Sequence, residues 1–466
     1  MLFSSIPFLY YFIPCVIVLY FAVTKCLKNS VLLLSSLFFY AWGEPKYLAF
    51  MLFSITQGYV FAILIEKYRN KRWSKVFMAI SVFLSLLLLG YCKYADFFIS
   101  NLNILTGMSI PLLRIALPIG ISFYTFQLVS YTVDVYRGDV PAQKNYINLA
   151  AYIAMFPQLI AGPIVRYSDI AKQLEHRTHS FEDAAMGIRR FIIGLSKKIL
   201  IANILGELVS LFKASDEKSI LYFWLYAIAY MLHIYFDFSG YSDMAIGLGR
   251  VFGFRFPENF DYPYVSGSIT EFWRRWHISL GSWFRDYLYI PLGGNRVSRP
   301  RWLFNIFIVW MATGLWHGAA WNFALWGILF AVLLMVEKLW LLTILKRHQV
   351  LSHIYVLLVV MLSFVIFDAS GMTEAFSYIT AMFGLQNFPA VTAISIYYLR
   401  SYIIVLIIGI IGATPILNQL ATIVKKNRQA ETIWNLAEPV VLTALLAVCT
   451  AFLIDGSFNP FLYFRF

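Results

Sequence analysis

Long apolar runs recur along almost the whole chain, and they restrict the folds that it can adopt. The runs cover about 6–23, 31–42, 48–65, 76–92, 191–212, 220–236, 302–316, 323–345, 354–367, 394–411 and 440–454. Hydrophobic residues make up 60% of the sequence and charged residues only 13%, unlike the balance in soluble domains. Because one crossing of a bilayer needs about 20 residues, we predict an all-α, polytopic integral membrane protein with about eleven transmembrane helices.

The apolar pattern is interrupted between Pro111 and Ile164. The interrupting residues are Pro118, Gly120, Gln127, Asp134, Pro157, Gln158, Gly162 and Pro163. A break that faced lipid would leave backbone polar groups without hydrogen-bond partners, so such breaks occur where protein encloses them. We therefore expect broken or re-entrant helices around an enclosed cavity.

The net charge of +13 comes from 37 Lys and Arg against 24 Asp and Glu. No RNA- or DNA-binding motif accompanies this excess, and short basic loops on the cytoplasmic side of a membrane protein produce the same imbalance. We therefore predict no nucleic-acid partner. The basic loops place the start of the last apolar run inside and the tail from Asp455 outside.

One stretch, from Glu271 to Trp321, begins as a basic aromatic segment and ends strongly apolar, with His277 and His317 in its two halves. An ionisable side chain near a bilayer centre costs at least a few kcal/mol, which makes each histidine a candidate functional residue. If the first half is one helix, His277 lies on its aromatic face while Arg274 turns away. We predict an interfacial helix with His277 pointing inward.

His317 ends the apolar run and is followed by three small residues, Gly318, Ala319 and Ala320. Their size would leave room for a thioester or ester carbonyl beside the ring, and a neutral imidazole can take a hydroxyl proton. A histidine packed against a neighbouring helix would give the same pattern, and from these residues alone both interpretations stay open.

Other catalytic chemistries leave no motif in the sequence. There is no GxSxG elbow, P-loop, HExxH or deaminase-type metal motif, which argues against a serine hydrolase, an NTPase and a zinc enzyme. Four scattered cysteines lack CxxC or Cys/His spacing, so we expect neither disulfides nor metal ligands among them. We predict no metal and no bound cofactor.

A polar cluster follows the run at 220–236. Asp237, Ser239, Tyr241, Ser242 and Asp243 are predicted to lie at a helix end, before Gly247, Gly249 and Gly253. The segment GLGRVFG matches a dinucleotide fingerprint only weakly, because no strand and no acidic partner of a βαβ unit accompany it. Close packing between membrane helices is the better explanation for these glycines.

Four motifs resemble the membrane-bound O-acyltransferase (MBOAT) family, in its bacterial branch of AlgI- and DltB-type proteins. They are PQLIAGPIVRY at 157–167, YFDFSGYSDMAIGLGRVFGF at 235–254, FWRRWHISLGSWFRDYLYIPLGG at 272–294 and TGLWHGAAWNFALWG at 313–327. The resemblance implies one MBOAT domain around a central funnel. We divide it into N-terminal helices (1–110), a catalytic core (111–345), C-terminal helices (346–454) and an extracytoplasmic aromatic tail (455–466).

The resemblance implies acyl transfer from a cytosolic thioester donor to an acceptor across the bilayer. The family's membrane histidine corresponds to His317, and its second polar active-site residue corresponds to His277. We expect acetyl-CoA as the donor and a cell-envelope polysaccharide as the final acceptor, with an extracytoplasmic, SGNH-type hydrolase-like transferase as partner. The expected location is the bacterial cytoplasmic membrane.

The tail NPFLYFRF, 459–466, resembles the aromatic C-terminal motif of a small peptide that works beside DltB-type proteins. In that peptide a tyrosine near the end accepts the acyl group, which would make Tyr463 an acyl carrier here. An interfacial belt of aromatic residues is the alternative.

Three questions stay open at this point. Arg274, Arg275, Arg285 and Arg296 either dock the phosphates of an anionic donor or only anchor the cytoplasmic side. D-alanyl transfer from a carrier protein is the alternative reaction. A transporter or scaffold without covalent chemistry is the alternative class of protein.

Overall fold

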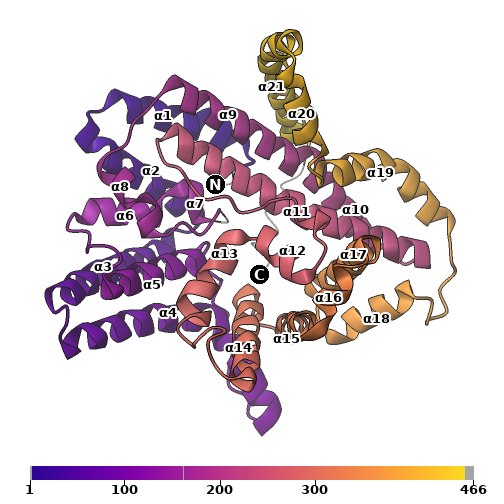
Figure 1. The fold of residues 1–466 in the computed structure, drawn as a ribbon, viewed down its shortest axis with the longest axis horizontal. Coiled ribbons are helices and arrows are strands. Elements are labelled where there is room, and N and C mark those ends of the chain that lie inside the picture. Colours follow the sequence, from indigo (N-terminus) through magenta and orange to yellow (C-terminus); the bar gives the residue numbers. More distant parts are fainter. Residues whose placement is uncertain (1–2, 161, 457–466) are drawn as a thin grey trace. The chain divides into compact units, whose positions relative to one another are not determined.

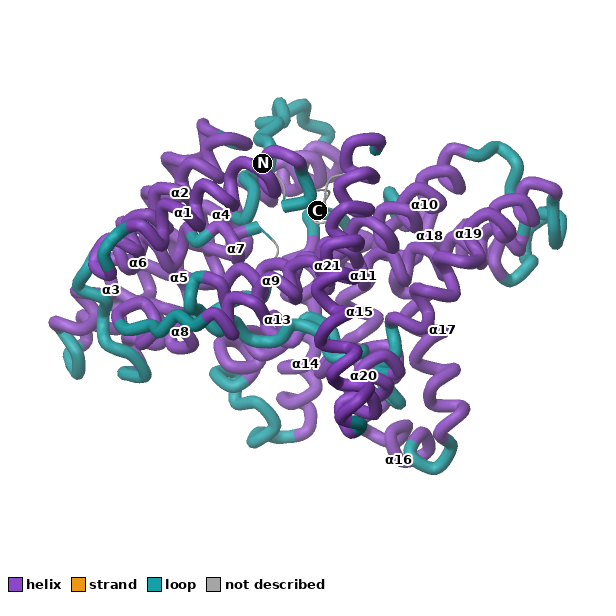
Figure 2. The backbone as a smooth tube through the Cα atoms, turned by 90° about the horizontal axis from the view of Figure 1, so that it is seen from above, coloured by secondary structure: helices purple, strands orange, loops and turns teal. Residues whose placement is uncertain are grey.

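The computed structural model describes residues 3–160 and 162–456, and this part of the chain is built from helices joined by loops (Figure 2). Within it no strand forms, and one isolated antiparallel bridge pairs Phe260 with Trp276. The predicted all-α fold is confirmed.

Seven helices of the described residues are long and apolar enough to cross a membrane. They are Pro45–Lys67, Arg72–Thr106, Ile220–Val251, Trp321–Leu345, Gln349–Asp368, Ala393–Gly412 and Arg428–Asp455. The apolar helix Pro7–Ala22 is shorter than these seven. The chain is thus a multi-pass membrane protein, as predicted, although the count of about eleven crossings is not confirmed.

The chain divides into two compact units, and the first comprises residues 1–191 and 244–258. Its helices are α1 (Ile13–Ala22), α2 (Lys28–Gly43), α3 (Leu48–Lys67), α4 (Arg72–Thr106), α5 (Ile121–Arg137), α6 (Tyr146–Ala154), α7 (Phe156–Leu159), α8 (Tyr167–Glu175) and most of α9 (Phe181–Ser196). Within this unit α3, α4 and α5 lie side by side (Figure 1). The division into four segments predicted from the sequence is not tested by these units and stays a prediction.

The second unit comprises residues 192–243 and 259–466 and contains both candidate histidines. Its helices are α10 (Ile204–Ala214), most of α11 (Ile220–Val251), α12 (Ile269–Arg275), α13 (Ile278–Phe284), α14 (Arg299–His317), α15 (Trp321–Val336), α16 (Leu342–Leu345), α17 (Gln349–Asp368), α18 (Met372–Met382), α19 (Ala393–Gly412), α20 (Ile416–Lys426) and α21 (Arg428–Asp455). In this unit α14 packs against α15.

The predicted interruption of helices between 111 and 164 is present in the first unit. α5 begins only after Gly120, whose φ of +75° lies in the left-handed region, and α6 is separated from α7 at Met155. Most side chains of α5 and all of those near the end of α6 are buried. Protein therefore surrounds the break between α6 and α7, which supplies the partners that lipid lacks, whereas residues 111–114 before α5 are exposed.

One predicted helix end is wrong. The polar cluster from Asp237 to Asp243 does not end a helix, because α11 continues through it to Val251. Buried Asp237 pairs with buried Lys198, and Asp243 pairs with Lys197 at 2.7 Å. These partners neutralise the carboxylates, so the helix can continue through residues that would otherwise be costly to bury.

Close helix packing does explain the first glycine of the segment GLGRVFG. A Cβ atom on Gly247 would meet the carbonyl oxygen of Gly187 in α9 at 2.5 Å. A Cβ atom on Gly187 would likewise meet the carbonyl oxygen of Gly247 at 2.6 Å. Two backbones can come this near only where neither residue has a side chain. No dinucleotide site is needed to account for this pair.

Candidate active site

The predicted interfacial helix is broken at His277, which corrects the expectation of one continuous helical face. α12 ends at Arg275, α13 begins at Ile278, and His277 between them has φ +44° and ψ +55°. A left-handed conformation costs a non-glycine residue roughly 1–2 kcal/mol, and such strain is often found at functional sites. Because His277 belongs to neither helix, the direction of its imidazole is not set by the helical geometry of α12 or α13.

A segment eighteen residues upstream in the sequence holds this break in place. The backbone N–H of Ile278 donates to the carbonyl of Asn259 at 3.0 Å, and the N–H of Asp261 donates to the carbonyl of Arg275 at 2.9 Å. The side-chain Oδ1 of Asn259 lies 3.1 Å from His277 Nδ1. Residues 259–261 thus determine the path of the backbone and the orientation of the ring.

His277 is almost completely buried, with 1% of its surface exposed. Its ring stands edge-on to Phe238, with 4.7 Å between ring centroids. Burial lowers the pKa of His277 well below its ordinary value, and the neighbouring charge of His317 lowers it further. The imidazole is therefore neutral at pH 7, as a proton acceptor must be.

His317 is positioned by a very close approach of α14 to α15. A Cβ atom on Gly314 would lie 2.3 Å from the carbonyl oxygen of Phe323 and 3.0 Å from the Cα of Gly327. A Cβ atom on Gly318 would lie 2.1 Å from the ring of Phe323. The glycines on both sides of His317 are therefore required for this packing, and the small residues here serve helix contact.

Aromatic rings surround the imidazole of His317, which is 8% exposed. Its centroid lies 4.9 Å from that of Trp316, 5.2 Å from that of Trp326 and 5.3 Å from that of Phe367. Trp316 also lies 6.0 Å from His277, so one indole ring is shared by the two histidines. The predicted pair is therefore brought together within the second unit.

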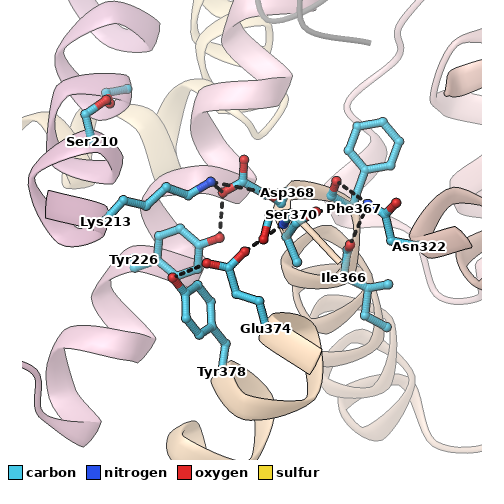
Figure 3. Close-up of polar contacts among 12 residues, drawn as sticks. Ser210, Lys213, Tyr226, Asn322, Ile366, Phe367, Asp368, Ser370, Glu374 and Tyr378 are labelled. Atoms are coloured by element: carbon cyan, nitrogen blue, oxygen red, sulfur yellow. Dashed lines mark hydrogen bonds and ion pairs between the residues drawn. The ribbon is translucent and has the colours of Figure 1, made fainter. Parts of the chain in front are cut away.

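Phe367 is held over His317 by polar contacts at the end of α17, shown in Figure 3. The side-chain amide of Asn322 in α15 faces the carbonyls of Ile366, Phe367 and Ala369, with the shortest contact, 3.0 Å, to Ala369. The last carbonyls of a helix lack partners within it, so this amide acts as their cap. It ties α17 to the helix that follows His317.

The next residue, Asp368, adds a second attachment (Figure 3). Its carboxylate lies 2.7 Å from Lys213 Nζ and accepts a hydrogen bond from the Tyr226 hydroxyl at 2.6 Å. In the same network Glu374 accepts from the Tyr378 hydroxyl at 2.8 Å and from the backbone N–H of Ser370 at 2.6 Å. The end of α17 is thereby fixed to α10, α11 and α18.

A cavity of about 730 Å³ lies beside His277 in the second unit. This volume is typical of small-molecule sites. Its lining includes Arg274, His277, Arg285, Trp310 and Lys338. His317 is not among the lining residues, so of the two histidines His277 is the one that faces this space.

Arg274 and Lys338 give the cavity an unbalanced positive charge. Each forms no ion pair with the described part of the chain, and the two lie near enough for their charges to repel. Arg285 also lines the cavity, but its guanidinium binds the neighbouring Asp286 at 2.7 and 3.1 Å. Two cations without an ion pair beside a cavity favour an anionic ligand, although the charge of Glu337 also acts on Lys338.

The other two arginines of the predicted donor set lie elsewhere. Arg275 pairs with Glu271 at 2.9 Å and with Asp261 at 3.0 Å, and Arg296 is exposed. Neither is among the cavity-lining residues. Their role in donor binding stays a prediction, and so does that of Tyr463, which lies outside the described residues.

Glu337 fixes the start of α12, where Thr270 lines this cavity. Its carboxylate accepts hydrogen bonds from the backbone N–H groups of Ile269 and Thr270, at 2.6 and 2.8 Å, and from the Thr270 hydroxyl at 2.6 Å. An anion at a helix N-terminus satisfies the free N–H groups and complements the helix dipole. Since Lys338 is the next residue, this cap also sets the distance between Lys338 and α12.

The sequence reasoning missed Asn259 and Lys338. Asn259 lies in the segment PENFDYPY, 257–264, between the second and third of the four motifs, and no role was predicted for it. Lys338 lies within a long apolar run and next to Glu337. A charged pair inside such a run was a usable signal, because intramembrane charges are rare without a function.

Comparison with known proteins identifies related chains. The family model described as MBOAT, membrane-bound O-acyltransferase family, matches residues 139–403. A protein of Azotobacter vinelandii named "Probable alginate O-acetylase AlgI" is 39% identical, with all of both chains covered. A peptidoglycan O-acetyltransferase of Helicobacter pylori is 33% identical over 83% of this chain and 80% of its own.

A relative that covers less of this chain is named for transfer of a different group. The teichoic acid D-alanyltransferase of Bacillus subtilis is 32% identical, over 46% of this chain and 58% of its own. The names of these relatives therefore refer to three different polymers, alginate, peptidoglycan and teichoic acid.

Proposed function

Since the chain belongs to the membrane-bound O-acyltransferase family, we propose that it transfers an acetyl group from cytosolic acetyl-CoA across the membrane for O-acetylation of a cell-envelope polysaccharide. The chain is an O-acyltransferase. The identities of its acyl donor and its acceptor are what we propose here. Relatives named for acetylation of alginate and of peptidoglycan support acetyl as the group and a polysaccharide as the acceptor.

The observation that carries the proposal is the pair of buried histidines that share Trp316 beside a cationic cavity. An anionic thioester donor would place its phosphates near Arg274 and Lys338 and its acyl end toward His277. The cavity supplies the charge that docking needs, and the histidines supply the proton transfer. A transporter or scaffold would require neither in this arrangement.

The reaction balances with these groups alone. A neutral imidazole takes the proton of the acceptor hydroxyl while its oxygen attacks the thioester carbon. The new C–O bond forms, the C–S bond breaks, and the imidazolium returns the proton to the leaving thiolate. We assign the principal base to His317 and an assisting role to His277, as the resemblance implies.

The proposed acceptor in the first step is the phenol of Tyr463. With a reference pKa of about 10, the phenol needs a base to react at neutral pH, and the histidine pair would provide one. Its acyl ester would then be passed to an extracytoplasmic SGNH-type transferase, which completes acetylation of the polymer. We place the enzyme in the bacterial cytoplasmic membrane.

D-alanyl transfer from a carrier protein is the second candidate. The Bacillus subtilis relative favours it, although that relative matches less than half of this chain. A carrier protein presents its thioester on a large surface, whereas acetyl-CoA is small enough to enter a cavity. The two donors can therefore be compared directly.

The test is transfer of labelled acyl groups by the purified protein in lipid nanodiscs. We expect label from acetyl-CoA to appear on the protein or on an added acceptor, and we expect His317→Ala to abolish it. Label accepted only from a D-alanyl carrier protein would favour the second candidate. No transfer from either donor by wild-type protein would contradict both.

A further inference from the structure

We propose that Asn259 is a positioning residue that holds His277 in a single tautomer, with hydrogen on Nδ1 and the lone pair on Nε2. The catalytic consequence of this tautomer rests on the proposed acyl transfer, whereas the tautomer itself follows from the hydrogen bonds around the ring.

The first step is the orientation of the Asn259 amide. The backbone N–H of Ser279 points at one terminal atom of this amide, with 3.3 Å between nitrogen and oxygen. A backbone N–H can only donate, so the atom that it meets must be the oxygen, Oδ1. The other terminal atom, Nδ2, donates to the Ser242 hydroxyl at 3.1 Å, which fits the same orientation.

The second step concerns the ring. His277 Nδ1 lies 3.1 Å from Asn259 Oδ1, an atom that can only accept. The Ser279 hydroxyl, 3.4 Å from the same Nδ1, gives its hydrogen to Asn259 Oδ1 at 2.8 Å. No donor is therefore left for a bare Nδ1, and this nitrogen must carry the hydrogen itself.

The third step concerns the opposite nitrogen. In a neutral imidazole only one nitrogen is protonated, so Nε2 carries the lone pair. Nε2 is buried and has no hydrogen-bond partner among the described residues, although His277 lines the cavity. A buried acceptor normally has a partner. We infer that the missing partner is the hydroxyl of the acyl acceptor, and that His277 enters the reaction as a proton acceptor at Nε2.

This arrangement also gives a role to two motifs that the reaction itself does not explain. Ser242 belongs to the polar cluster of α11, and Asn259 belongs to the segment PENFDYPY. Both residues are buried, with 2% and 1% of their surfaces exposed. Hydrogen bonds connect Ser242 in α11 to the Asn259 amide, and this amide to the His277 ring. Each of these hydrogen bonds restricts the orientation of the ring.

The first test observes the tautomer without any activity measurement. Histidine labelled in its ring nitrogens is incorporated into the full chain, and NMR in nanodiscs compares wild type with Asn259→Ala and Asn259→Asp. Comparison with His277→Gln identifies the signals of His277. We expect a single Nδ1–H tautomer in wild type and in Asn259→Asp, and a mixture in Asn259→Ala. A single unchanged tautomer in Asn259→Ala would overturn the proposal.

The second test uses the pH dependence of acyl transfer. A carboxylate at position 259 keeps the acceptor but stabilises the imidazolium, so Asn259→Asp should move the acid limb of the pH–rate profile to higher pH. Asn259→Ala should lower kcat about tenfold or more across the profile, since part of the population presents the wrong nitrogen. An acid limb that stays in place in Asn259→Asp would also overturn the proposal.

A matched control separates positioning from general loss of structure. Asn305 is another fully buried asparagine of this unit, whose amide donates to the carbonyls of Leu292 and Gly294. Asn305→Ala should lower the melting temperature and leave the His277 tautomer unchanged. If wild type shows the expected tautomer but transfers no acyl group, the proposed function fails while the assignment of Asn259 stands.

Discussion

Gly314 in α14 lies so close to Phe323 in α15 that a Cβ atom added to the glycine would meet the phenylalanine carbonyl oxygen at 2.3 Å. Real Cβ atoms essentially never approach another atom this closely. Because Gly314 precedes His317 by less than one helical turn, any shift that relieves such a clash moves the imidazole as well.

Replacement of Gly314 by alanine should therefore impair activity without touching the site chemically. We expect Gly314→Ala to lower kcat by about tenfold or more, since small misplacements of reacting groups are costly. Gly90→Ala in α4 is the control, because a Cβ atom there meets nothing within 4 Å. Alanine also stabilises a helix relative to glycine by about 1 kcal/mol. Gly90→Ala should therefore not destabilise α4, and this control should keep full activity. Equal activity of the two variants would contradict the packing argument.

The two histidines should behave as a unit. Removal of a positioned base usually costs about 10²- to 10⁴-fold in rate, which we expect for His317→Ala, with a smaller loss for His277→Ala. The double variant should lose little more than His317→Ala alone, because losses from cooperating groups are not additive. Single-turnover rates with labelled donor would measure this. Fully additive losses would indicate separate roles.

The stability of the protein should depend on pH through His277. Burial lowers the pKa of His277 in the folded state, whereas the unfolded chain binds this proton near pH 6.5. Below that pH the unfolded state holds more protons, so the free energy of unfolding should fall as pH falls, by at most about 1.4 kcal/mol per pH unit.

Thermal melting in detergent between pH 7.5 and pH 5 would test this, because the reference pKa of histidine, about 6.5, lies within this range. We expect His277→Gln to melt with a weaker dependence on pH than wild type. His348→Gln, at an exposed position, is the control and should follow the wild-type curve. A wild-type slope retained in His277→Gln would contradict the prediction.

Two of the cavity cations should dominate donor binding. Arg274→Gln and Lys338→Gln should weaken acetyl-CoA binding, and the loss should shrink as salt is added, because ions screen charges beyond about 8 Å at physiological ionic strength. Arg347→Gln is the control, since this exposed arginine is not among the cavity-lining residues and was not predicted to bind the donor. It should leave donor affinity unchanged. Calorimetry at two salt concentrations would decide.

Tyr463 should carry the acyl group during turnover. Mass spectrometry of the C-terminal peptide, after incubation with labelled donor and without the downstream transferase, should show one added acetyl group in wild type and none in Tyr463→Phe. The phenol is a stronger acid than an alkyl alcohol, so its ester passes the acyl group on more readily. Full acetylation of polymer by Tyr463→Phe would return the tail to an interfacial anchor.

The long helices were predictable because a bilayer imposes one requirement on each of them. An apolar run such as 394–411 predicts a transmembrane helix whatever residues surround it. This run corresponds to α19, Ala393–Gly412. The proximity of His277 and His317 could be expected only from the resemblance. Their spacing in the sequence contains no information on the turn that joins their helices.

The break at His277 could not be predicted from local periodicity. The spacing of Trp273, Trp276 and Leu280 fits one helix, but hydrogen bonds from residues 259–261 determine the path of the chain here. Likewise, α11 continues through Asp237 because Lys198 is present on another part of the chain. In both cases a long-range partner outweighs the local preference, and one sequence does not reveal that partner.

The contact between Phe367 and His317 sets an order of events during biosynthesis. A ribosome delivers the chain from its N-terminus, so both histidines enter the membrane before α17 has been made. Until α17 arrives, one aromatic wall of His317 is missing, and the Asn322 amide has no helix end to cap. We therefore expect the surroundings of His317 to be completed only when α17, a helix without a candidate catalytic residue, has been inserted. A premature stop before α17 would yield a membrane protein that keeps both histidines but lacks Phe367, one aromatic wall of His317.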